Sequence, residues 1–181
     1  STISAFIQLD QKKCINNDLS GKRILISAGP TIEAFDDARF ISNRSSGKMG
    51  VLLAIASKQR GADVALVHGP LKTPKGWLEG LKKYPIRSSQ EMGNELHKLQ
   101  PFSDAIIMAA AVADLKAKNV PKKSKLKKIS LIETLKTELE IVPDILKALV
   151  LKRPLGQVIV GFAALTGSDE SVLELAKTKK I

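Results

Sequence analysis

Short runs rich in valine, isoleucine and leucine alternate with longer helix-like stretches along most of this 181-residue chain. The expected strands are residues 23–27, 64–68, 105–109, 129–132, 139–142 and 158–162. The expected helices are residues 48–60, 89–99, 143–151 and 169–180. Alternation of this kind predicts an α/β fold with a doubly wound, mainly parallel sheet of the Rossmann-like kind. Ligands bind such sheets beyond the carboxyl ends of the strands, so the loops after the strands should hold the site.

The chain is expected to form one domain over residues 21–181, preceded by a leader over residues 1–20. Its net charge is +11, from 29 Lys+Arg against 18 Asp+Glu. Such an excess predicts an anionic partner, which could be nucleic acid, a membrane surface or phosphorylated small molecules. Seven lysines fall between Lys116 and Lys128, and no aromatic residue lies among them, unlike a platform for single-stranded nucleic acid. The segment from Leu115 to Lys128 is expected to be a lysine-rich flap that closes over a nucleotide.

No apolar run reaches the roughly 18 residues that span a bilayer, and the first twenty residues lack the apolar core of a signal peptide. Cys14 is the only cysteine, so no internal disulfide can form in this chain. We therefore expect a cytoplasmic protein that binds phosphorylated small molecules, with neither nucleic acid nor membrane as its partner.

The loop after the first strand, residues 27–31, is made of small residues around Gly29. Such a loop lets backbone N–H groups approach a nucleotide closely. It matches neither the Gly-x-Gly-x-x-Gly fingerprint nor the Gly-Lys-Ser/Thr ending of a Walker A loop. Two interpretations stay open, a nucleotide loop and an ordinary tight turn.

Residues 39–50 place small residues and cations just before the helix expected at residue 48. A helix N-terminus favours anions through its free N–H groups and its dipole. The residues that would hold a phosphate are Arg39, Arg44, Ser45, Ser46, Gly47 and Lys48. Asn43 beside them offers a neutral donor and acceptor for an acyl oxygen. The alternative is a serine cap with solvated basic neighbours, but the twelve residues together favour a phosphate site.

Two further segments carry candidate residues. Alanines 109–111 at a strand end leave room for a ligand, and Asp114 could bind a ribose hydroxyl or a base amino group. The alternative there is a small-residue packing site with a capping aspartate.

In the block 125–128, lysines suit a triphosphate or a departing pyrophosphate. For most of the lysines in this region, a solvated charge run is the simpler interpretation.

Taken in order, these motifs resemble bacterial phosphopantothenoylcysteine synthetase. The resemblance rests on Ile26–Thr31, Ile41–Gly50, Ala110–Asp114, Lys125–Lys128, Pro143–Ile145 and Gly161–Ala164. It implies a nucleotide-binding ligase domain that joins 4'-phosphopantothenate to cysteine in coenzyme A biosynthesis. The substrate carboxylate would attack the α-phosphate of CTP, with Mg²⁺ and lysine neutralising the triphosphate, and the amine of cysteine would then displace CMP from the acyl-cytidylate.

The resemblance also assigns roles to single residues. Lys125 matches the family's essential lysine, and Asn43 matches the asparagine that holds the acyl intermediate. Gly29, in the first of these motifs, and Lys125 are expected to bind the nucleotide. Nucleotide binding falls on Ala109, Ala110, Ala111, Asp114, Pro143, Asp144, Ile145, Leu146, Phe162 and Lys179. Arg39 matches an arginine near the dimer interface, so a homodimer is expected.

The resemblance bears on the ends of the chain as well. The family normally continues past the last helix, so a truncated C-terminal end is expected at Ile181. A flavin-binding decarboxylase is often fused upstream of this domain in bacteria, and it could be fused or separate here.

Two other functions remain open from the sequence. An NAD(P)-dependent oxidoreductase would use the same kind of sheet, but its glycine fingerprint is absent. It would also need a Tyr-x-x-x-Lys pair, whereas Tyr84 is followed by Arg87 and Ser88. A basic module that binds nucleic acid would show a steep salt dependence.

Overall fold

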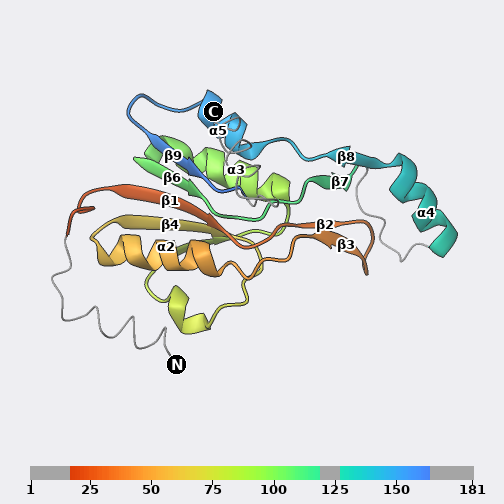
Figure 1. Cartoon of the computed structure of the whole chain (residues 1–181), viewed down its shortest axis with the longest axis horizontal. Coiled ribbons are helices and arrows are strands. Elements are labelled where there is room, and N and C mark those ends of the chain that lie inside the picture. Colours follow the sequence, from red (N-terminus) through yellow and green to blue (C-terminus); the bar gives the residue numbers. More distant parts are fainter. Residues whose placement is uncertain (1–16, 119–126, 164–181) are drawn as a thin grey trace, which may run out of the picture.

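The computed structural model describes residues 17–118 and 127–163. At its centre lies a five-stranded sheet, parallel throughout, with the order β5-β4-β1-β6-β9 (Figure 1). The strands are β1 (Arg23–Ala28), β4 (Asp63–His68), β5 (Lys82–Pro85), β6 (Ala105–Met108) and β9 (Val158–Gly161). The predicted α/β fold with a doubly wound, Rossmann-like sheet is confirmed.

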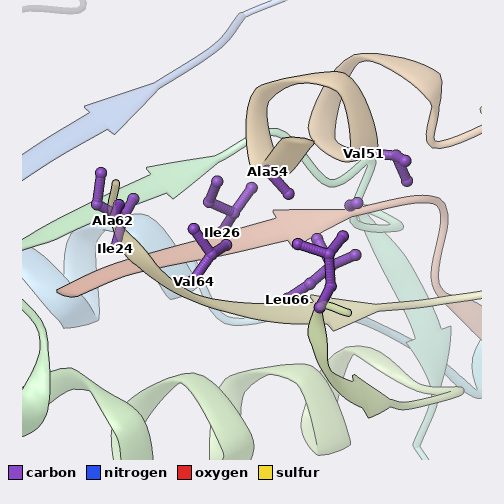
Figure 2. Close-up of a cluster of buried hydrophobic side chains, with 9 residues drawn as sticks. Ile24, Ile26, Val51, Ala54, Ala62, Val64 and Leu66 are labelled. Atoms are coloured by element: carbon purple, nitrogen blue, oxygen red, sulfur yellow. The ribbon is translucent and has the colours of Figure 1, made fainter. Parts of the chain in front are cut away.

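Helices cover both faces of this sheet (Figure 1). On one face, α2 (Lys48–Gln59) packs on β1 and β4, with Ile24, Ile26 and Leu66 in the shared core (Figure 2). On the other face, α3 (Ser89–Leu99) and α5 (Ile145–Leu151) enclose a second core around Leu25 and Ile106. Because β1 is buried on both faces, its sequence is a continuous apolar run rather than an alternating one.

The strand order contains a switch point between β1 and β6. The chain adds β4 and β5 on one side of β1, and then returns to add β6 and β9 on the other side. The connections that leave β1 and β6 therefore diverge at their carboxyl ends. In open parallel sheets, such a divergence creates the crevice in which ligands bind.

Two antiparallel hairpins extend the molecule beyond the carboxyl ends of the central strands (Figure 1). The first joins β2 (Ile32–Ala34) to β3 (Phe40–Ser42), and it is inserted between β1 and α2. The second joins β7 (Leu115–Ala117) to β8 (Leu139–Ile141), with helix α4 (Lys128–Thr137) between them. Strand β2 lies against β7, so the two hairpins meet beyond the carboxyl ends of the central strands.

Several predicted elements differ from the structure. No helix or strand was predicted over residues 71–87, but this stretch contains the short 3-10 helix η2 (Lys75–Leu78) and the edge strand β5. Residues 28–47, also without a predicted helix or strand, contain the first hairpin. The prediction of a strand at 129–132 is wrong, because these residues belong to α4. The flap expected from residue 115 begins as strand β7. Its residues 119–126, the helix expected at 169–180 and leader residues 1–16 lie outside the described residues.

The described end of the predicted leader, residues 17–20, packs against the domain. Leu19 lies against the first core, and its N–H donates to the carbonyl of Arg60 at 3.0 Å. The side chains of Asp18 and Arg60 form an ion pair. These contacts attach residues 17–20 to the C-terminal end of α2.

Glycines bring α2 close to β1. Gly50 has no room for a side chain, because a Cβ there would lie 2.6 Å from the Cβ of Ala28 and 2.8 Å from the carbonyl oxygen of Ser27. At the helix start, Gly47 has a left-handed φ of 74° and lies against Gly29. The helix can therefore begin directly at the carboxyl end of β1 despite the hairpin inserted between them.

We predict that Gly50→Ala destabilises the domain by about 1–3 kcal/mol, because the new methyl group overpacks the contact between α2 and β1. Gly93→Ala is the matched control, since Gly93 also lies inside a helix but its Cβ would make only ordinary 3.7 Å contacts with Ile145. That change should be neutral or stabilising by up to about 1 kcal/mol. Urea unfolding measures both, and equal effects would contradict the tight contact.

At the opposite end of the sheet, Asp104 joins the starts of β1 and β6. Its carboxylate accepts the backbone N–H of Arg23 at 2.7 Å and faces the guanidinium at 3.3 Å. The hydrogen bond from the Arg23 side chain, followed by the one from its backbone, lowers the pKa of Asp104 below its ordinary value. The ionised form is thus favoured in the folded state.

A lowered carboxyl pKa stabilises the fold above the unfolded pKa of about 3.9, and this contribution is lost as the pH falls through the folded value. We predict that Asp104→Asn lowers stability at pH 7 and flattens the loss of stability below pH 4. Urea midpoints from pH 7 to pH 3 measure this. Parallel curves for the wild type and the variant would contradict it.

Candidate functional site: a cleft at the switch point of the sheet

A cleft of about 790 Å³ opens at the switch point, beyond the carboxyl ends of the parallel strands. Its walls come from four parts of the chain that are far apart in sequence. The lining residues are Asn43, Arg44, Ser45, Met49, Met108, Ala109, Ala110, Ala111, Val112, Ala113, Asp114, Ile141, Val142, Pro143, Asp144, Ile145, Leu146, Gly161 and Phe162.

The first wall is the loop 109–114, which continues from β6 and runs beside the extension of β1. The N–H of Ala110 donates to Ser27 Oγ at 3.1 Å, and the N–H of Ala111 donates to the carbonyl of Gly29 at 2.9 Å. Further along, the N–H of Ala113 donates to Thr31 Oγ1 at 3.0 Å. The loop is therefore fixed from the β1 side, and its small side chains leave space in the cleft.

Asn43 approaches the same loop from the first hairpin. It follows directly after β3, and its Nδ2 donates to the carbonyl of Val112 at 2.8 Å. An amide side chain carries a second N–H and an acceptor oxygen, so this contact leaves further capacity for a ligand. Arg44 and Ser45 line the cleft beside it.

The opposite wall is formed by residues 141–146, where β8 leads into α5. The N–H of Val142 donates to the carbonyl of Asp114 at 2.9 Å. This bond joins the wall to the loop 109–114, called the alanine loop below. Asp144 caps α5, since its Oδ1 accepts the N–H of Lys147 at 2.9 Å. At the end of β9, Gly161 is close to Leu146, where a Cβ would meet the leucine side chain at 2.7 Å.

The serine-rich segment before α2 forms local turns. Ser45 Oγ accepts the N–H of Gly47 at 3.2 Å, and Ser46 Oγ accepts the N–H of Lys48 at 3.3 Å. The face of Gly47 that a Cβ would occupy is covered by Leu71, at 2.2 Å. The residue at the N-cap of α2 is Gly47, and no side chain makes a capping hydrogen bond there, so the two serines form local turns and not a serine cap.

The predicted site residues fall into three groups. Those that line the cleft are Asn43, Arg44, Ser45, Ala109, Ala110, Ala111, Asp114, Pro143, Asp144, Ile145, Leu146 and Phe162. Those absent from its lining are Gly29, Arg39, Ser46, Gly47 and Lys48. Arg39 lies beside the buried Asp36, 3.9 Å from its carboxylate. Lys125 and Lys179 lie outside the described residues.

Sequence reasoning missed seven lining residues, which are Met49, Met108, Val112, Ala113, Ile141, Val142 and Gly161. Met108 and Gly161 end β6 and β9, so the strand-end rule could have found them. Ile141 and Val142 required knowledge that β8 turns towards the sheet. Nothing in the local sequence signals that.

The described lining has little fixed charge, namely Arg44 as its cation and Asp114 and Asp144 as its carboxylates. Within residues 17–118 and 127–163, no group of three or more His, Cys, Asp or Glu side chains could hold a metal ion. In the same part of the chain, no helix has the length and apolar character needed to cross a membrane.

The parallel sheet of order β5-β4-β1-β6-β9, with a cleft at its switch point, defines a Rossmann-like ligand-binding domain. The family described as the C-terminal domain of DNA/pantothenate metabolism flavoproteins matches residues 19–181. The chain belongs to this family.

Curated relatives carry the name coenzyme A biosynthesis bifunctional protein CoaBC. The Bacillus subtilis protein is 45% identical over 154 residues, which cover 84% of this chain and 36% of the relative. The Vibrio cholerae protein is 43% identical over 156 residues, covering 84% and 38%, and the Mycobacterium bovis protein is 37% identical over 190 residues, covering 98% and 43%. The chain thus spans about two fifths of the length of these relatives.

Solved structures agree with the fold. The crystal structure of the C-terminal domain of CoaBC has a TM-score of 0.73 and 36% identity, covering 91% of this chain and 75% of that chain. A mutant of Cab2 in complex with phosphopantothenate-cysteine has a TM-score of 0.66. Its identity is 19%, over 96% of this chain and 72% of that chain, so it shows the fold alone.

Proposed function

We propose that this domain is a phosphopantothenate–cysteine ligase that uses CTP and forms an acyl-cytidylate intermediate. One observation carries the proposal. The resemblance assigns nucleotide binding to residues 109–111, 114, 143–146 and 162, and it assigns the acyl group to Asn43. These residues line the same 790 Å³ cleft, although they are spread over 120 positions of the sequence. Of the other expected nucleotide-binding residues, Gly29 does not line the cleft, and Lys125 and Lys179 lie outside the described residues.

The names of the relatives support the same chemistry. The curated relatives are coenzyme A biosynthesis proteins, and the Cab2 structure of the same fold holds phosphopantothenate-cysteine. That ligand is the product that a ligase of this kind would release. The use of CTP rests on the resemblance to the bacterial form.

The cleft suggests how the two steps divide between its walls. A nucleotide against the alanine loop would meet backbone groups and the carboxylate of Asp114, while Asn43 would lie beside the reacting acyl group. In the first step, a carboxylate oxygen of 4'-phosphopantothenate attacks the α-phosphorus, and the bond to pyrophosphate breaks. In the second step, the cysteine amine attacks the acyl carbon, loses a proton, and CMP leaves. Asn43 can donate a hydrogen bond to the acyl oxygen of the intermediate, which gains negative charge when the cysteine amine attacks in the second step.

The residues of this site fit a Mg²⁺ ion that binds together with the triphosphate of the nucleotide. Mg²⁺ usually keeps several waters and binds through one or two carboxylates together with substrate phosphates. Asp114 and Asp144 both line the cleft, and the described residues provide no larger acidic cluster. When bound, the ion would supply charge neutralisation on the phosphates.

The wider setting is part of the same proposal. We propose a cytoplasmic homodimer that acts with a flavin-dependent decarboxylase, either fused or separate. The decarboxylase rests on the family resemblance, and the printed name of the relatives describes them as bifunctional. Neither nucleic acid nor a membrane is proposed as a partner.

The proposal is tested by mixing the protein with 4'-phosphopantothenate, cysteine, Mg²⁺ and either CTP or ATP. Formation of 4'-phosphopantothenoylcysteine and pyrophosphate with CTP is the expected result. A thermal-shift panel with CTP, ATP, NADP and an oligonucleotide is run beside it, because a ligand at 100 times its Kd stabilises the folded state by about 2.7 kcal/mol. Stabilisation by NADP or the oligonucleotide, without product formation, would overturn the proposal.

We predict that Asn43→Asp blocks the second step while the first continues. A carboxylate cannot donate a hydrogen bond to the acyl group, and it repels the neighbouring phosphate. Mass spectrometry should therefore show accumulating acyl-cytidylate. Asn94→Asp is the matched control, since it makes the same change at an exposed residue of α3 that does not line this cleft. Normal turnover of cysteine by the Asn43 variant would refute its assignment.

We also predict that Lys125→Gln abolishes activation of the carboxylate. Loss of one contact to developing negative charge costs about 3 kcal/mol, or about a hundredfold or more in rate. The control is Lys116→Gln, because Lys116 is engaged with Glu140 at 3.2 Å in the second hairpin. Pyrophosphate release measures both variants. Equal losses would mean that the lysines act as a diffuse charge and that no single one is catalytic.

A further inference from the structure

Two hydroxyl side chains at the carboxyl end of β1 are fully buried, on Ser27 and Thr31. Each accepts a backbone N–H of the alanine loop, from Ala110 and Ala113 respectively. Neither side chain lines the cleft, so neither can touch a ligand there. Their hydrogen bonds nevertheless determine where one wall of the cleft lies.

Thr31 differs from Ser27 because it also contacts the hairpin. Its carbonyl oxygen accepts the hydroxyl of Ser42 at 2.7 Å, and its own N–H donates to the carbonyl of Ala111 at 3.3 Å. Ser42 directly precedes Asn43, and Ala113 directly precedes Asp114. One buried residue is thus bonded to the neighbours of two polar residues that line the cleft, Asn43 and Asp114.

We propose that Thr31 is a positioning residue that fixes the spacing between Asn43 and the alanine loop. The proposal rests on the proposed function, in which Asn43 serves the acyl group and the loop serves the nucleotide. In the intermediate the acyl group and the nucleotide are joined through one mixed anhydride bond to the α-phosphate, so the two walls of the cleft must keep a set distance. A displacement of about 1 Å from productive geometry can cost about a hundredfold in rate.

The hydroxyl of Thr31 is the group that the test must remove while the shape of the side chain is kept. Valine has nearly the shape of threonine, but it leaves the buried N–H of Ala113 without its acceptor, and an unpaired buried N–H is unfavourable. The loop must then shift to find another acceptor, and Asp114 shifts with it. Serine keeps the hydroxyl and should keep the loop in place.

The experiment compares Thr31→Val with Thr31→Ser in two assays. Exchange of pyrophosphate into CTP reports the first step. Formation of 4'-phosphopantothenoylcysteine, the cysteine adduct, reports both steps together. For Thr31→Val we expect a nucleotide KM raised about tenfold and a kcat/KM lowered about tenfold to a hundredfold. Thr31→Ser should remain within about threefold of the wild type, as rescue by the retained hydroxyl requires.

Ser42→Ala separates the contact of Thr31 with the hairpin from its contact with the alanine loop. It removes the hydroxyl that steadies Asn43 and leaves the alanine loop untouched, so adduct formation should fall about tenfold while the nucleotide KM stays within about twofold. Ser103→Ala is the control, because its hydroxyl bonds the carbonyl of Leu99 at 3.0 Å before β6, at the far end of the sheet. Its kinetics should match those of the wild type.

Several outcomes would overturn the proposal. Thr31→Val with unchanged kinetics, or Thr31→Ser with an equal loss, would show that the hydroxyl does not position the site. If Thr31→Val fails to fold, Ser42→Ala decides, and unchanged adduct formation would reject the proposal.

A measurement that needs no catalytic turnover distinguishes failure of the proposed function from failure of the positioning role of Thr31. If the wild type forms no adduct with any nucleotide, the ligase assignment fails. Amide hydrogen exchange at Ala113 still measures the contact itself, with faster exchange expected in Thr31→Val than in the wild type or Thr31→Ser. Equal exchange rates in all three proteins would overturn the positioning role, whatever reaction the domain performs.

Discussion

The hydrogen bonding of β1 on both of its edges is the constraint on which the rest of the structure depends. This strand pairs with β4 on one side and β6 on the other, and both of its faces are buried. The pairing does not stop where the strand ends, because residues 29–31 continue it with Ala111. The wall of the cleft is therefore an extension of the sheet, which gives it a precision that a free loop would lack.

Much of the fold could be predicted because the central strands are apolar on both faces. The elements that were missed lack that signal. Strand β5, Lys82–Pro85, lies at the sheet edge, and its side chains are mostly exposed. In α4, the exposed Ile129, Ile132 and Leu135 recur every three residues, which is close to the helical period, so the prediction of a short strand there rested on the wrong period.

The site could be predicted where a motif coincides with a strand end, as it does at residues 109–114. It could not be predicted where a contact depends on how two distant segments are aligned. The bond from Thr31 to Ala113 joins residues 82 positions apart, and neither residue is unusual in sequence. The contact of Leu71 with Gly47 is another such case. The glycine fits a phosphate loop equally well until its neighbour is known.

The position of β1 in the middle of the sheet also has a consequence for synthesis on the ribosome. It is the first strand of the sheet to emerge, but its partner β6 follows only 81 residues later, the separation between Arg23 and Asp104. At about 5–20 residues per second, this interval lasts about 4–16 s. Throughout this interval at least one edge of the apolar strand β1 lacks its partner, which exposes the nascent chain to association with other chains and to binding by chaperones.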